Sequence, residues 1–188
     1  MSASLDAQLI KRFRGGEATA FDALVLRHRQ RVFRLVYRMT GDADWAEDIT
    51  VEVFLEAYLS LPGFQQRSQF NTWLHRLAVN VCLEHIRHRK AKRYLTEEPL
   101  DSQHIASPGN PADAAMNRDL AQRITAAMQD LPECHRAAVV MYHLENLSCA
   151  EIAEILGISR NTVKTRIFYG TRVLRDLLRA NGVLSDAG

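Results

Sequence analysis

Apolar side chains recur every three or four positions along most of this chain, a spacing typical of α-helices that bury one face. In the first half, this pattern predicts helices over residues 6–14, 18–39, 44–61 and 70–89, with Gly and Pro residues between them. No segment alternates apolar and polar residues as a half-buried strand does. We therefore expect a four-helix bundle.

The helical spacing also predicts which side chains of the first half face the core. They are Phe21, Leu24, Val25, Val32, Leu35, Val36 and Met39 in the second helix, Ile49, Val53, Ala57 and Leu61 in the third, and Phe70, Leu74, Leu77 and Val81 in the fourth.

The second half of the chain shows the same helical period. We expect helices over residues 114–129, 132–144, 149–156 and 160–180. Pro132 suits the first turn of its helix, because that turn needs no backbone donor. Ser148 followed by Glu151 predicts a capping box at the start of the next helix.

Residues 96–115 separate the two helical halves. They contain three of the five prolines and lack a helical apolar period. We expect a flexible linker there, joining a domain of residues 1–95 to a domain of residues 116–188. About 20 extended residues span roughly 66 Å, which is long enough for the domains to bind separate stretches of one ligand.

Composition and charge narrow the class of protein. The 188 residues are 47% hydrophobic and 24% charged, as in an ordinary globular protein. The chain has neither a long apolar run nor a signal peptide, so we expect a cytoplasmic location without direct membrane insertion.

The net charge of +2 is distributed unevenly. Residues 1–95 carry 15 basic and 10 acidic side chains. Residues 96–115 carry no basic side chain and 4 acidic ones. Residues 158–179 carry six basic side chains against Asp176 alone. Two basic segments on either side of an acidic spacer indicate two places that meet polyanions.

Residues 149–168 have the spacing of a helix-turn-helix motif. Ala153 is small where two helices cross, and Gly157, four residues later, suits a turn with positive φ. Ile158 and Val163 supply an apolar wedge, and Ser159 can cap the second helix. The remaining core positions of the motif are Ile152, Leu156 and Ile167.

The second helix of this motif is expected to expose a face that can enter a DNA major groove. There, arginine, lysine, asparagine and threonine side chains reach base edges. The alternative is a helical hairpin with a glycine turn and no ligand, which the joint pattern disfavours. The expected face consists of Arg160, Asn161, Lys164, Thr165, Phe168 and Tyr169.

The first half offers less specific signs of nucleic-acid binding. The loop 62–69 is polar, and Phe64 is its exposed aromatic candidate. A loop of this kind, beside amide, imidazole and guanidinium groups, can hold an unstacked base. A solvated polar face is the alternative, as it is for the basic residues 85–93. The helix side chains of this group, expected to point away from Leu74 and Leu77, are Asn71, His75, Arg76 and Asn80.

The sequence argues against an enzyme or a metal protein. It contains no phosphate-binding loop of the P-loop type, no His-Glu-x-x-His motif and no Cys-x-x-Cys pair. Cys82, His85 and His88 share one segment, where packed or solvated side chains are favoured over a metal site. Nothing assigns a redox role to Cys134 or Cys149. We expect no cofactor and no catalysis.

Three segments, in this order, resemble bacterial sigma factors. Residues 46–54 look like the helix that docks on RNA polymerase, and residues 70–80 look like the helix that reads the promoter −10 element. Residues 131–174 are similar to the domain that reads the −35 element. With its short linker, the chain resembles the extracytoplasmic-function (ECF, group 4) members of the sigma-70 family.

This resemblance implies an all-α fold, with a sigma2-like four-helix bundle in residues 1–95 and a sigma4-like helix-turn-helix domain in residues 116–188. It implies an alternative sigma factor that binds core RNA polymerase and promoter DNA. It also implies an anti-sigma factor partner, which can hold the protein at the inner membrane. The alternative function is a stand-alone helix-turn-helix regulator, which leaves residues 48–54 and 70–80 unexplained.

The resemblance also implies roles for individual residues. Core polymerase binding falls on Asp48, Val51, Glu52 and Leu55. Contact with the −10 element falls on Phe64, Gln65, Gln66, Arg67, Ser68, Asn71, His75, Arg76 and Asn80. Contact with the −35 element falls on Arg160, Asn161, Lys164, Thr165, Arg166, Phe168, Tyr169 and Arg172.

Three positions depart from the family pattern. Val51 replaces a common Gln, so we expect part of the polymerase contact to be apolar. Tyr169 and Gly170 stand where a basic residue and Ala are common, which predicts an altered −35 sequence. We expect Gly170 to loosen its helix by about 1 kcal/mol relative to Ala.

Overall fold

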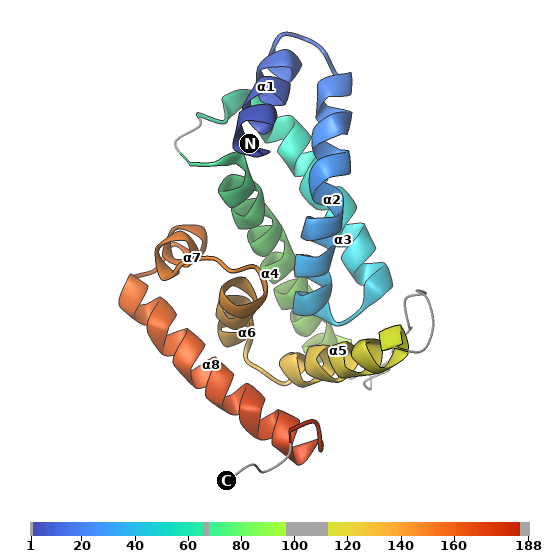
Figure 1. The fold of residues 1–188 in the computed structure, drawn as a ribbon, viewed down its shortest axis with the longest axis vertical. Coiled ribbons are helices and arrows are strands. Elements are labelled where there is room, and N and C mark those ends of the chain that lie inside the picture. Colours follow the sequence, from blue (N-terminus) through green and yellow to red (C-terminus); the bar gives the residue numbers. More distant parts are fainter. Residues whose placement is uncertain (1, 66–67, 97–112, 185–188) are drawn as a thin grey trace. The chain divides into compact units, whose positions relative to one another are not determined.

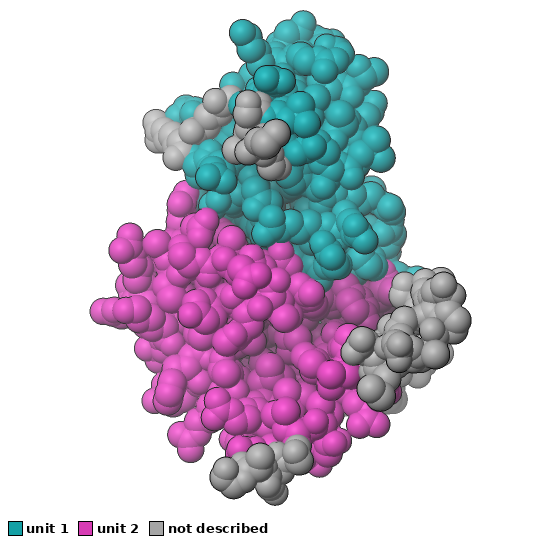
Figure 2. Space-filling model, in the orientation of Figure 1, with its two compact units in different colours: residues 1–36, 44–97 teal, residues 37–43, 98–188 magenta. Residues whose placement is uncertain are grey.

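The computed structural model describes residues 2–65, 68–96 and 113–184, which form helices joined by short turns and contain no strand (Figure 1). The prediction of an all-α fold is therefore confirmed. The chain divides into two compact units, residues 1–36 with 44–97 (unit 1) and residues 37–43 with 98–188 (unit 2) (Figure 2). Most of the predicted linker, residues 97–112, lies outside the described residues.

Unit 1 contains the four predicted helices. They are α1 (Ser2–Arg14), most of α2 (Thr19–Thr40), α3 (Ala43–Ser60) and α4 (Phe70–Thr96), with a short 3₁₀ turn, η1 (Leu61–Gly63), after α3. The helix α4 extends seven residues beyond its predicted end at residue 89, because neither Gly nor Pro interrupts the sequence before Pro99.

The core of unit 1 follows most of the predicted apolar spacing. Ile49, Val53, Ala57 and Leu61 of α3 and η1 are fully buried, as predicted. The predictions for Val25 and Leu77 are wrong, because both side chains are only half-buried. Phe70, Leu74 and Val81 of α4 are buried, as predicted. The buried face is wider than predicted, because it also includes His75, Ala78, Val79 and Cys82.

A buried acidic side chain connects the first two helices. The carboxylate of Asp6 on α1 accepts a hydrogen bond from Arg27 Nε at 3.1 Å and lies 3.2 Å from His28 Nε2, both on α2. Burial lowers the pKa of the His28 imidazole below its ordinary value of 6.5, despite the opposing attraction of Asp6.

Unit 2 contains the helices of the second half. They are α5 (Asp113–Gln129), α6 (Glu133–Val139), a π-helical turn η2 (Val140–Leu144), α7 (Cys149–Leu156) and α8 (Arg160–Ala180). The helix α8 packs against α5, α6 and α7. Its buried side chains include Val163 and Leu178.

The connection from α5 to α6 differs in detail from the prediction. Pro132 caps α6 instead of lying in its first turn, with φ −53° and ψ 139°. The buried Arg136 donates from Nη2 to the carbonyls of Gln129 at 2.8 Å and Leu131 at 3.1 Å, which fixes the turn. The predicted helix 132–144 changes to π-helical geometry at Val140.

Gly170 is buried at the crossing of α6 and α8. A Cβ atom at this position would lie 2.7 Å from Cγ2 of Val139 and 3.3 Å from Cβ of His135. The expected loosening of α8 considers helix propensity alone and leaves out this close packing. The missing side chain allows the two helices to approach, and this packing gain opposes the low helix propensity of glycine.

Candidate nucleic-acid interface

The helix α7 begins with a complete capping box, as predicted. Ser148 Oγ accepts a hydrogen bond from the backbone N–H of Glu151 at 3.3 Å. The Glu151 carboxylate accepts one from the backbone N–H of Ser148 at 2.9 Å. These reciprocal bonds satisfy two helix-end donors and fix where α7 starts.

The turn between α7 and α8 also has the predicted chemistry. Gly157 adopts φ 63° and ψ 33°, a left-handed conformation that favours glycine. Ile158 N–H donates to the carbonyl of Ala153 at 3.1 Å and closes the turn. Ser159 Oγ accepts from Thr162 N–H at 3.1 Å and caps α8. Residues 148–162 therefore form a helix-turn-helix in which a serine caps the N-terminus of each helix.

The interior of this motif matches the predicted set only in part, and the predicted wedge residue Ile158 is half-buried. Ile152 and Val163 are fully buried, as predicted. Ile155, absent from the prediction, is also buried, whereas Leu156 and Ile167 are only half-buried. The three buried side chains lock α7 against the first turns of α8.

The predicted reading face of α8 is exposed. Phe168 is 63% exposed and Tyr169 is 51% exposed, and their ring centroids lie 5.4 Å apart. Large aromatic side chains at such exposure carry a free-energy cost in water, which contact with a partner would relieve. The polar members that are exposed beside them are Arg160, Asn161, Lys164, Thr165 and Arg172, whereas Arg166 is half-buried.

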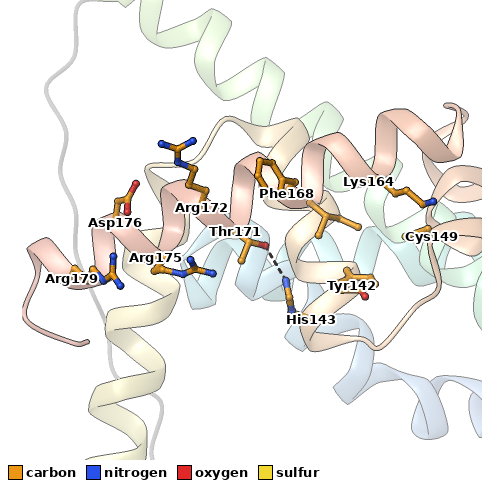
Figure 3. A pocket seen from close by; sticks show the side chains of 11 residues that line it. Tyr142, His143, Cys149, Lys164, Phe168, Thr171, Arg172, Arg175, Asp176 and Arg179 are labelled. Atoms are coloured by element: carbon orange, nitrogen blue, oxygen red, sulfur yellow. Dashed lines mark hydrogen bonds between the residues drawn. The ribbon is translucent and has the colours of Figure 1, made fainter. Parts of the chain in front are cut away.

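An open groove of about 820 Å³ runs along α8, opposite η2 and the start of α7 (Figure 3). Lys164, Phe168 and Arg172 of the predicted face line it. His143 of η2 lies across from them and forms a hydrogen bond with Thr171 Oγ1 at 3.0 Å. Basic and aromatic groups thus meet at one concave surface of unit 2.

Phe64 was the exposed aromatic candidate of the first half, and this expectation is wrong. Its side chain is only 6% exposed. Its ring centroid lies 4.9 Å from that of Trp73 and 6.2 Å from that of Phe70. Phe64 therefore packs under the loop, because burying an aromatic ring against two others is more favourable than leaving it in water.

The expected orientation of His75 is also wrong. The side chain is 2% exposed, and Nδ1 lies 2.7 Å from the carbonyl oxygen of Asn71, one turn earlier. A direct contact with a base would require His75 to leave the core. His75 belongs to the part of the buried face of α4 that the apolar spacing does not predict.

The other −10 candidates have different degrees of exposure. Gln65, Arg76 and Asn80 are exposed, and Asn71 and Ser68 are half-buried. Arg76 and Asn80 are one helical turn apart on α4, so they share a face. Gln66 and Arg67 lie outside the described residues.

Arg14, at the end of α1, was not predicted to matter for this loop. Its Nη2 donates to the carbonyl of Leu61 at 3.2 Å and to the carbonyl of Phe64. It therefore holds the chain where the loop leaves η1. The contact spans 47 and 50 residues in sequence, so no local pattern could have revealed it.

The exposed face of α3 carries the predicted polymerase-binding residues. Asp48, Val51, Glu52 and Leu55 are all exposed, and Glu52 Oε2 lies 2.8 Å from Nε2 of His85 on α4. Leu59, which is outside the predicted set, is also 70% exposed. Its spacing of four residues from Leu55, and of eight from Val51, was the available signal.

The side chains considered for a metal site do not come together. Cys82 is buried, whereas His85 pairs with Glu52 and His88 lies 3.8 Å from Glu84. Among the residues that the structure describes, no group of three or more His, Cys, Asp or Glu side chains could hold a metal ion. Within residues 2–65, 68–96 and 113–184, no helix has the length and apolarity needed to cross a bilayer.

Comparison with known families gives two matches. Residues 24–92 match the family model "Sigma-70 region 2", and residues 121–170 match "Sigma-70, region 4". These matches fall on unit 1 and unit 2 respectively, apart from residues 37–43. They cover α3, most of α4 and the helix-turn-helix described above.

Curated relatives match over most of their length. The chain is 36% identical over 177 residues to the ECF RNA polymerase sigma factor SigW of Bacillus subtilis, covering 90% of this chain and 95% of that protein. It is 31% identical to the ECF RNA polymerase sigma-E factor of Escherichia coli K12, covering 87% and 88%.

Two solved structures share the fold. The first is the sigma factor RpoE in complex with the anti-sigma factor NepR from Bartonella quintana, with a TM-score of 0.71 at 19% identity, covering 85% of this chain and 96% of that one. The second is CnrH in complex with the cytosolic domain of CnrY, with a TM-score of 0.68 at 22% identity, covering 94% and 98%. The family matches and the curated relatives place this chain in the ECF group of the sigma-70 family of RNA polymerase sigma factors.

Proposed function

We propose that this chain is an alternative sigma factor that binds core RNA polymerase and directs initiation at promoters through their −10 and −35 elements. The observation that carries the proposal is the exposed basic and aromatic face of α8, presented by a doubly capped helix-turn-helix. The relatives named above, which are RNA polymerase sigma factors, support it.

In this proposal, unit 2 reads duplex DNA at the −35 element. The first turns of α8 enter the major groove, where Arg160, Asn161 and Lys164 reach base edges. Val163, which is fully buried, keeps α8 at a fixed angle to α7. Rigid support of this kind lowers the entropy cost of ordering the reading side chains on binding.

Unit 1 then stabilises the opened strand at the −10 element. Extruding a base costs a few kcal/mol, and a pocket that holds the base offsets this cost. Gln65, Arg76 and Asn80 are the exposed groups suited to hydrogen bonds with a base edge. Phe64 supports the loop from below by packing on Trp73.

Docking on the polymerase falls to α3. Its exposed face combines the apolar side chains of Val51, Leu55 and Leu59 with the carboxylates of Asp48 and Glu52. Apolar groups gain free energy on burial, and carboxylates select a basic partner surface. The mixed face is therefore suited to a partner surface that is apolar in its centre and basic at its edge.

The remaining parts of the proposal concern organisation and control. Residues 1–95 and 116–188 act as separate DNA-contacting domains, and residues 96–115 act as the tether between them. The chain needs no cofactor and catalyses no reaction, because the polymerase forms the bonds. It acts in the cytoplasm and is controlled by an anti-sigma factor that covers its binding surfaces. The solved complex of RpoE with the anti-sigma factor NepR and that of CnrH with the cytosolic domain of CnrY support this part.

The test of the function is reconstitution. Purified chain is added to bacterial core RNA polymerase with genomic fragments, and transcripts are mapped to their 5′ ends. We expect new start sites that share one pair of upstream elements and depend on the chain. Binding to duplex without any new initiation would support the stand-alone helix-turn-helix regulator instead.

The docking face is tested separately with the full chain. Asp48→Ala combined with Glu52→Ala should weaken association with core polymerase by about tenfold, because two charge-assisted contacts are lost. The control, Asp22→Ala with Glu84→Ala, removes the same charge from α2 and α4, where both side chains are exposed. Equal core affinity of the two double variants would contradict the assignment of α3.

A further inference from the structure

The basic face of α8 continues past its reading residues. Arg175 and Arg179 are exposed, and both line the groove beside η2. At 100° per residue, Arg175 projects within about 20° of the direction of Lys164, three turns earlier. The predicted −35 contacts end at Arg172, so the role of these two arginines is not accounted for.

The groove has the charge expected of a phosphate-binding surface. Its wall on α8 carries Lys164, Arg172, Arg175 and Arg179, and Asp176 is the one acidic side chain among the lining residues. Figure 3 shows His143 opposite Arg175, with its ring held by the hydrogen bond to Thr171. Four cations along one concave edge favour an extended polyanion over a single anion.

Distance along the helix separates this end from the base-reading end. Arg175 lies 11 residues after Lys164, or about 16 Å at a rise of 1.5 Å per residue. A B-DNA major groove is about 12 Å wide. When Lys164 reaches base edges, Arg175 therefore lies at or beyond the wall of the groove, where the phosphates are.

We propose that the groove between α8 and η2 binds the phosphate backbone of the promoter duplex, with Arg175 as its central contact. This inference rests on the proposed function, since it assumes that α8 docks in the −35 major groove. The contact is independent of sequence, because phosphates carry no base identity. It sets the register of α8 in the groove and leaves base selection to the earlier residues.

The experiment measures binding by holoenzyme, formed from full chain and core RNA polymerase. Labelled duplexes carry either the matched −35 element or the same element with its bases substituted, and the salt concentration is varied. The variants are Arg175→Ala, Arg175→Lys and the control Arg123→Ala. Arg123→Ala removes the same net charge from α5, where the exposed Arg123 pairs with Asp119.

We expect Arg175→Ala to weaken binding about three- to tenfold on both duplexes, so that their affinity ratio stays unchanged. The slope of log affinity against log salt should fall by about 0.9, the value for one lost phosphate contact. Arg175→Lys should retain the slope, because it keeps a cation, and Arg123→Ala should match the wild type.

Two results would overturn the inference: an unchanged salt slope for Arg175→Ala, or a loss confined to the matched duplex. Free polyphosphate shares this chemistry, so the full chain is also titrated with inorganic triphosphate. Submillimolar binding that Arg175→Ala abolishes would assign the groove to a small anion instead. If wild-type holoenzyme does not prefer the matched duplex, the proposed function itself fails, whatever the slopes show.

Discussion

The α7–α8 hairpin and the segment from Phe64 to Asn80 are both predicted from sequence to present side chains to DNA, yet the structure treats them differently. In the hairpin, nearly every predicted reading residue is exposed. In the other segment, Phe64 and His75 are buried in the core of unit 1. The hairpin exposes its candidate DNA-contacting side chains to solvent. In the other segment, Phe64 and His75 are packing residues, which support the loop and the helix α4.

The difference reflects how each region is specified. The hairpin is fixed by local interactions between residues three to five apart, namely the two serine caps and the turn at Gly157. Such interactions leave a readable pattern in a short stretch of sequence. The orientation of α4 depends on its contacts with distant helices, and these decide which polar side chains are buried.

The largest expected effect is on Phe64. Phe64→Ala should destabilise unit 1 by about 3 kcal/mol, because it leaves a cavity beside Trp73. Urea unfolding followed by tryptophan fluorescence measures this effect. Gln65→Ala, the exposed neighbour, should change stability by less than about 0.5 kcal/mol. A stable Phe64→Ala protein that fails only in promoter opening would reverse our view of this side chain.

The next effect concerns the packing of α6 against α8. Gly170→Ala should destabilise unit 2 by about 2 kcal/mol, because the new methyl group meets Val139. Hydrogen exchange of α6 and α8 measures this, and Val139→Ala in the same chain should restore protection. At Gly63, a Cβ meets nothing within 4 Å, so Gly63→Ala is the control. Increased protection in Gly170→Ala would show that helix propensity dominates.

Base reading is tested at Lys164. Lys164→Ala should lower affinity for the matched −35 duplex about tenfold, through loss of base-edge contacts, and leave core polymerase association intact. Fluorescence anisotropy on matched and substituted duplexes measures the change. The ratio of affinities for the matched and the substituted duplex should fall in Lys164→Ala, whereas it should stay unchanged in Arg175→Ala. Equal losses in DNA and polymerase binding would indicate misfolding of unit 2 instead.

The smallest effect is the pH dependence of unit 1. Burial lowers the pKa of His28, so the unfolded chain binds a proton at higher pH than the folded one. This contribution to stability is complete above pH 6.5 and is lost as pH falls toward the lowered pKa. His28→Gln should flatten the decline in unfolding free energy between pH 7 and pH 5. The charged groups that face this imidazole are Asp6, Arg27 and Arg31.

Sequence alone predicts the helices and most of the core, because apolar spacing and breaker residues are local signals. It does not predict the tight approach at Gly170, since the partner residues His135 and Val139 lie about thirty residues earlier in the chain. Nor does it predict that Asn146, at φ 54°, ends the helical run after η2. Positions that depend on the partner helix lie beyond what spacing can show.

The arrangement of α8 separates two demands that usually conflict. Val163, Gly170 and Leu178 hold the helix in unit 2, while the side chains exposed to solvent contribute little to that packing. Substitution of an exposed residue can therefore alter promoter choice with almost no change in the free energy of unfolding. A lineage carrying this scaffold could acquire new target genes by single substitutions, without compensating changes elsewhere in the chain.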